Sequence, residues 1–154
     1  VAFTSLWDNY PDSLEIPLKG KASRAYLLMA GSTNHMQCHI DNGVIRVYYK
    51  DGTCDVMFLR NPDNWPPIEH IFFEDGLAFN RHTPALYRLR LKTGEISNNF
   101  GEELGFPGAS RELDGGAAVL LEMPLNPGKK LSHLVLETLS NDVVIGLMSI
   151  TLQR

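Results

Sequence analysis

Apolar and polar residues alternate along most of the chain, with the period of two that is typical of half-buried β-strands. Leu14, Ile16 and Leu18, for example, share one face of a predicted strand. No segment of normal helix length has the 3.6-residue period of an amphipathic helix. The pattern predicts about eight strands among nine candidate segments. These are 13–18, 25–30, 37–40, 44–49, 54–60, 85–91, 117–125, 131–139 and 143–152.

Two turn sequences predict a three-stranded meander over residues 37–60. Asp41-Asn42-Gly43 and Asp51-Gly52 contain the Asn-Gly and Asp-Gly pairs that tolerate positive φ at a hairpin tip. In the middle strand, Ile45, Val47 and Tyr49 form the predicted core face. In strand 85–91, the same alternation predicts that one face points inward and that Arg88 and Arg90 point outward. The inward face consists of Tyr87, Leu89 and Leu91.

Cys38 and Cys54 fall on the same face of this meander, but on its two outer strands. Two strand spacings separate them by roughly 9–10 Å, which exceeds the roughly 7 Å limit between the Cα atoms of a disulfide. We therefore expect two reduced, buried thiols that pack as small apolar side chains.

Short strands separated by turn signals favour an all-β fold, an antiparallel β-sandwich or barrel. The 154 residues are enough for one domain with a sizeable core, and no linker divides them, so we predict a single domain over 1–154. Because the chain does not begin with Met, we expect it to be an excised or processed part of a longer protein.

Charge and hydropathy narrow the classes of partner. The net charge is −4 and no run of Lys or Arg is present, which argues against nucleic acid and anionic membranes as partners. No apolar run is long enough to cross a bilayer.

The loop after residue 60 carries the strongest candidate for ligand binding. A sugar needs an aromatic plane for its C–H face and fixed polar groups for its hydroxyls. Trp65 stands in a proline-stiffened loop beside Asp63 and Asn64, with Glu74 further along the chain. Trp7 is a second candidate platform. The alternative is that each tryptophan plugs one end of the sandwich, which is the more frequent fate of this residue.

Several segments resemble the galactose-binding-like jelly-roll domains attached to exported bacterial glycoside-hydrolase-like proteins. The similar stretches are Ile16–Ala22, Val47–Thr53, Gly115–Ala118 and Val143–Leu147. The resemblance implies a jelly-roll β-sandwich, a periplasmic or extracellular location and an accessory role beside the parent's catalytic domain. Its motifs are turns and core strands, so it assigns no binding residue.

Catalytic motifs are not readable in the sequence. Glycoside hydrolysis needs two carboxylates at a fixed separation, but the spacing of Glu69, Glu74 and Asp75 selects no pair. A small stand-alone hydrolase would require two such groups to converge in one pocket. We therefore expect a non-catalytic domain.

Metal ligands are not predicted either. His35 and His39 lie in a loop-and-strand segment, where a gap of four residues spans roughly 13 Å. His70 and His82 stand alone, and no Cys/His group has zinc spacing. A structural calcium site built from loop carboxylates and carbonyls has too diffuse a pattern to identify.

Two functions remain open at this point. The favoured one is a non-catalytic carbohydrate-binding accessory module, with Trp65 as the stacking platform. The alternative is a structural domain that packs against a catalytic domain and binds no ligand. Exposure of Trp65 would favour the first function, and burial would favour the second.

Overall fold

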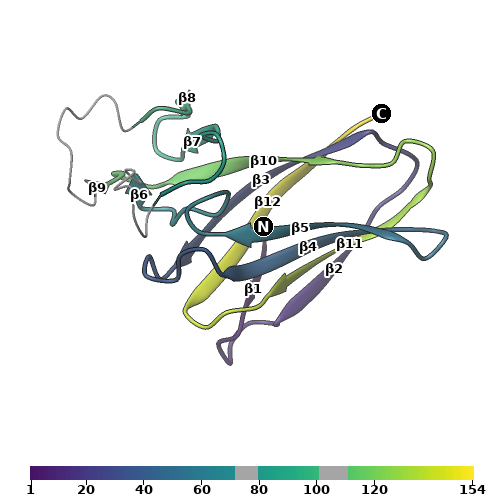
Figure 1. Cartoon of the computed structure of the whole chain (residues 1–154), viewed down its shortest axis with the longest axis horizontal. Coiled ribbons are helices and arrows are strands. Elements are labelled where there is room, and N and C mark those ends of the chain that lie inside the picture. The colour runs from purple at the N-terminus through teal and green to yellow at the C-terminus, as the bar shows by residue number, and fades with distance from the viewer. Residues whose placement is uncertain (72–79, 101–110) are drawn as a thin grey trace.

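Two antiparallel β-sheets form two layers in a computed structural model that describes residues 1–71, 80–100 and 111–154 (Figure 1). The six-stranded sheet has the order β1 (Ala2–Ser5), β12 (Val143–Gln153), β3 (Arg24–Thr33), β10 (Ala117–Pro124), β7 (Arg88–Arg90) and β8 (Ile96–Ser97). The four-stranded sheet has the order β2 (Ser13–Pro17), β11 (Leu131–Thr138), β4 (Asp41–Tyr49) and β5 (Cys54–Arg60). A separate short pair joins β6 (His70–Ile71) to β9 (Arg111–Glu112).

The predicted all-β antiparallel sandwich is confirmed, with ten strands in its two main sheets where about eight were expected. The jelly-roll assignment stays a prediction. Among the described residues, no helix is long and apolar enough to cross a lipid bilayer.

One hydrophobic core fills the space between the two main sheets. Its side chains come from the alternate, inward-facing positions of the strands. Ile45, Val47 and Tyr49 of β4 are buried, as predicted for the core face. Buried residues of the six-stranded sheet belong to the same cluster, among them Leu27, Met29, Leu121 and Ile145. Alternation along each strand therefore determines which face of each sheet is enclosed.

The predicted three-stranded meander is wrong at its first turn. Asn42 and Gly43 lie inside β4, which pairs with β5 and β11. A Cβ at Gly43 would lie 2.2 Å from Ile145 Cδ1, so glycine here permits close packing between the sheets rather than a turn. The second turn is confirmed, because Gly52 has a φ of 85° at the tip of the β4–β5 hairpin.

The burial predicted for the cysteines is also wrong, although neither cysteine forms a disulfide. The predicted register placed Cys54 opposite the core residue Tyr49. In the structure Cys54 pairs with Tyr48 instead, and this shift of one residue places it on the exposed outer face. Cys38 lies in the β3–β4 loop, partly buried, where it forms an isolated parallel bridge with Asn61.

The orientation predicted for Arg88 is reversed. Tyr87 and Leu91 are exposed, whereas Arg88 is partly buried and its guanidinium faces backbone carbonyls of neighbouring segments. It donates hydrogen bonds to the backbone carbonyls of Pro67, Ile68, His70 and Ala117. Burial lowers the pKa of Arg88 to about 10. This cation connects the loop after β5 to strand β10.

At the opposite end of the sandwich, Tyr49 joins two turns. Its hydroxyl donates to the Asp55 carboxylate and accepts a hydrogen bond of 2.7 Å from the Asn126 backbone N–H. Burial, followed by the hydrogen bond to Asp55, raises the pKa of Tyr49 to about 12. The β4–β5 hairpin is thereby linked to the β10–β11 turn.

We predict that Tyr49→Phe lowers the free energy of unfolding at pH 7 by about 1.5–3 kcal/mol, because a buried hydrogen bond to a carboxylate is lost. The folded state holds the phenol proton more tightly than the unfolded state, whose tyrosine has a pKa near 10. The Tyr49 contribution is therefore complete below pH 10 and declines as the pH rises from 10 toward 12. Urea unfolding at pH 7 and across this alkaline range measures both effects.

Tyr48→Phe is the matched control, since Tyr48 lies on the outer face and stacks on His133. Equal losses in the two variants would contradict the role assigned to the Tyr49 hydroxyl.

Candidate metal centre

The loop after β5 folds back onto the strand that precedes it. The Asn64 side chain accepts a hydrogen bond of 2.8 Å from the Arg60 backbone N–H and donates one of 2.9 Å to the Phe58 carbonyl. The Trp65 backbone N–H donates a hydrogen bond of 3.1 Å to the Arg60 backbone carbonyl. Asn64, predicted as a sugar ligand, therefore uses both ends of its amide to close this loop.

The loop directs Trp65 into the core, which corrects the prediction of an exposed stacking platform. Its side chain is 0% exposed and belongs to the main hydrophobic cluster. A Cβ at Gly31 would lie 2.8 Å from Trp65 Cζ2, so the indole packs directly against the β3 backbone. Neither face of the indole is open to a sugar ring.

The other predicted ligand residues are dispersed. Trp7 is 52% exposed in the connection between β1 and β2. Glu74 falls outside the described residues. Asp63 is partly buried, and the structure places it beside two histidines.

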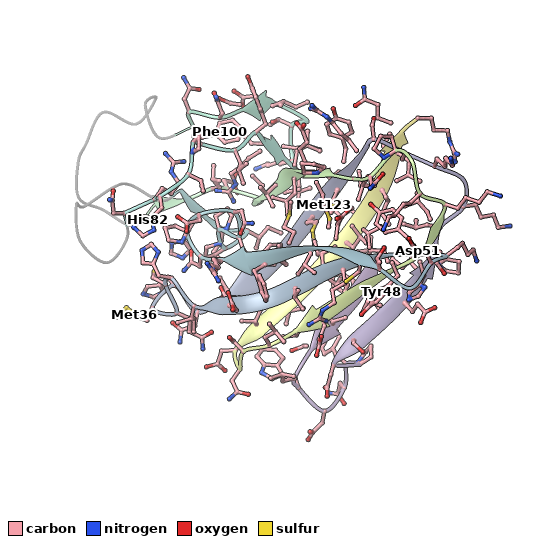
Figure 2. The ribbon with its side chains drawn as sticks, turned by 45° about the vertical axis from the view of Figure 1, so that its right-hand side comes forward. Met36, Tyr48, Asp51, His82, Phe100 and Met123 are labelled. Carbon is pink, nitrogen blue, oxygen red and sulfur yellow. The ribbon has the colours of Figure 1, made fainter. Side chains whose placement is uncertain are left out.

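His39, Asp63 and His82 form a histidine–aspartate cluster at one end of the sandwich. Their potential ligand atoms all lie within 4.8 Å of one another. Asp63 Oδ2 is 3.9 Å from His39 Nδ1 and 3.8 Å from His82 Nδ1, and the two imidazole rings stack with their centroids 4.4 Å apart. Figure 2 shows His82 at the same end of the molecule as Met36, which belongs to the β3–β4 loop that carries His39.

Backbone contacts hold the cluster together. His39 has a left-handed φ of 57° and donates its N–H to the Asn61 carbonyl at 2.8 Å. Asp63 Oδ1 accepts a hydrogen bond of 2.7 Å from the His82 N–H, and the Thr83 hydroxyl donates to the Asp63 carbonyl at 2.9 Å. The second carboxylate oxygen, Oδ2, therefore faces both rings.

No hydrogen bond joins Asp63 Oδ2 to either imidazole ring. Separations of 3.8 and 3.9 Å exceed the range of an N–H···O bond. Both ring nitrogens of His39 are buried and have no hydrogen-bond partner within the described part of the chain. Such unpaired buried groups are rare in proteins and call for an explanation, of which an ion is one.

The donor set fits a transition-metal ion. Zinc binds imidazole nitrogen and carboxylate oxygen at about 2.0–2.2 Å, which places neighbouring donors about 3.3 Å apart. The two Asp63–histidine separations would need to contract by about half an ångström, and the separation of the two histidine nitrogens, which lie within 4.8 Å of each other, by up to about 1.5 Å. Two imidazoles with one carboxylate also suit other divalent ions of the first transition row.

The prediction that His70 and His82 stand alone is wrong. His39 stacks on His82, while His35 stacks on His70 with the ring centroids 5.8 Å apart. Four of the five histidines thus gather in two pairs that bridge distant segments. Two histidines and a cysteine within His35–His39 were the one local indication of a metal site in the sequence. They did not indicate that Asp63 and His82 would lie beside His39.

Comparison of the chain with protein-family models, with curated proteins and with solved structures gave no match in any of the three cases. The resemblance to galactose-binding-like accessory domains therefore stays a prediction.

We predict that Trp65→Ala lowers the free energy of unfolding by about 3–5 kcal/mol, because a large enclosed side chain is replaced by a cavity. Trp7→Ala, at an exposed position, is expected to change it by no more than about 0.5 kcal/mol. Urea unfolding followed by circular dichroism compares the two variants. A loss at Trp65 no larger than the loss at Trp7 would contradict its role in the core.

Proposed function

We propose that this β-sandwich domain binds one divalent transition-metal ion, with His39, Asp63 and His82 as its ligands. The observation that carries the proposal is the His39 ring. Its two buried nitrogens lack hydrogen-bond partners in the described chain, and its Nδ1 lies 3.9 Å from Asp63 Oδ2, just beyond hydrogen-bond distance. The His82 ring stacks on it and lies 3.8 Å from the same carboxylate oxygen. A shared ion would pair with the Asp63 carboxylate, the His82 ring and one of the two His39 ring nitrogens at once.

The ion would cross-link three segments that are distant in sequence. His39 comes from the β3–β4 loop, Asp63 from the loop after β5, and His82 from the segment that leads to β7. The unfolded chain has no preformed site, so the binding free energy adds to the stability of the folded state. The role proposed for the metal is therefore structural support of this end of the sandwich.

In a larger protein, the domain would act as a non-catalytic accessory module. The resemblance to domains of exported glycoside-hydrolase-like proteins supports this role, together with a periplasmic or extracellular location and a catalytic domain as neighbour. Burial of Trp65 favours the structural form of this proposal over sugar binding at the loop after β5.

Zinc titration tests the metal proposal. Calorimetry of the metal-free chain should give one zinc ion per chain, and zinc at 100 times its Kd should raise the free energy of unfolding by about 2.7 kcal/mol. His82→Ala should weaken zinc binding by at least about 10–100-fold, the range found when even an outer-shell partner of a metal ligand is removed. Because His82 is 64% exposed, its removal should leave the apo fold intact.

His133→Ala is the matched control, because His133 lies on the outer face of β11, away from the cluster. The proposal fails if the wild-type chain binds no zinc at one equivalent. It also fails if His133→Ala weakens binding as much as His82→Ala does.

Exposure of Trp7 favours a second candidate function, carbohydrate binding at the β1–β2 connection. Its half-exposed indole stands next to Asp8 and Asn9, which can hydrogen-bond to hydroxyl groups. This site would be independent of the metal.

Tryptophan fluorescence tests this candidate, because the two indoles can be separated by substitution. In a Trp65→Phe variant, Trp7 is the only tryptophan, and a bound glycan should quench its emission saturably. Titration with a panel of polysaccharides should show this response in the wild type and in Trp65→Phe, but not in Trp7→Ala. A response that persists in Trp7→Ala would place sugar binding elsewhere.

A further inference from the structure

The cluster offers an ion fewer ligands than a closed structural site provides. Within the described residues, the group consists of His39, Asp63 and His82, with no fourth His, Cys, Asp or Glu. Structural zinc sites have four protein ligands, whereas sites with three keep a position for water or another molecule. We infer that a small carboxylate supplied from outside the chain binds the metal ion at this position, an inference that rests on the metal-binding function proposed above.

Asp63 cannot readily fill the position by binding through both oxygens. Its Oδ1 accepts the 2.7 Å hydrogen bond from the His82 N–H, so Oδ2 alone faces the imidazoles. That hydrogen bond also fixes the orientation of the carboxylate, as outer-shell partners of metal ligands generally do. Asp63 therefore counts as a single donor.

Exposure places the remaining position on the solvent side. The Asp63 side chain is 14% exposed and the His39 side chain 29%, whereas that of His82 is 64% exposed. An ion held by the three side chains would therefore have Asp63 and His39 on its more buried side and His82 on its exposed side. A ligand from solvent would reach such an ion beside His82.

Charge favours an anion as the external ligand. A divalent ion with one carboxylate and two neutral imidazoles has a net charge of +1. A carboxylate brings this charge to zero, while a hydroxyl or an amide leaves it unchanged. Carboxylate oxygen is also an established ligand for zinc and cobalt sites with imidazole donors.

Cobalt(II) provides a direct test, because its visible absorption bands respond to a change of ligand. The full chain is loaded with one equivalent of Co²⁺ and titrated with sodium acetate or sodium glucuronate. Acetamide and sodium perchlorate at matched concentration control for the neutral analogue and for ionic strength. We expect saturable changes in the bands with both carboxylates and none with either control.

The comparison of acetate with glucuronate distinguishes a general carboxylate site from one that prefers sugar acids, and either order of affinity supports the inference. His133→Ala should respond as the wild type does. Stoichiometric Co²⁺ binding with bands that acetate does not change would overturn the external-ligand inference and leave metal binding intact. A chain that binds no Co²⁺ would overturn both proposals.

Discussion

Enclosure of Trp65 is the constraint on which this end of the molecule depends. The indole fills the core beside Gly31, where the Val144 carbonyl of β12 and the indole itself leave no space for a side chain. To place the indole there, residues 61–64 must fold back over β5, and Asn64 closes that turn through the oxygen and the NH2 of its side-chain amide. The same turn then presents Asp63 at the edge of the core, next to His39.

Hydrogen bonds to backbone carbonyls stabilise the loops at this end of the molecule. Arg88 donates to backbone carbonyls of the loop after β5, of β6 and of β10, so one guanidinium joins three segments of the chain. His39 is held in its left-handed conformation by the carbonyl of Asn61. A local conformation of this kind is maintained only where surrounding contacts determine it, and such positions cluster at functional sites.

The position of Asp63 changes the interpretation of its loop. From the sequence, a tryptophan among Asn and Asp residues had the composition of a sugar site. In the structure, the aromatic and acidic members separate: Trp65 faces the core, and the Asp63 carboxylate faces two imidazoles. The loop thus combines a hydrophobic anchor with a potential metal ligand, and rigid anchoring is what a preorganised metal site requires.

The sequence by itself determined the all-β fold class, the core face of β4 and the hairpin at Gly52, because these follow from a period of two and from φ preferences within a few residues. It did not determine whether Asn42-Gly43 forms a turn or a strand. That depended on contact with Ile145, which lies in the opposite sheet. The partners of His39 were likewise decided only by the tertiary structure, because sheet pairing and the burial of Trp65 bring together loops that have no local relationship in the sequence.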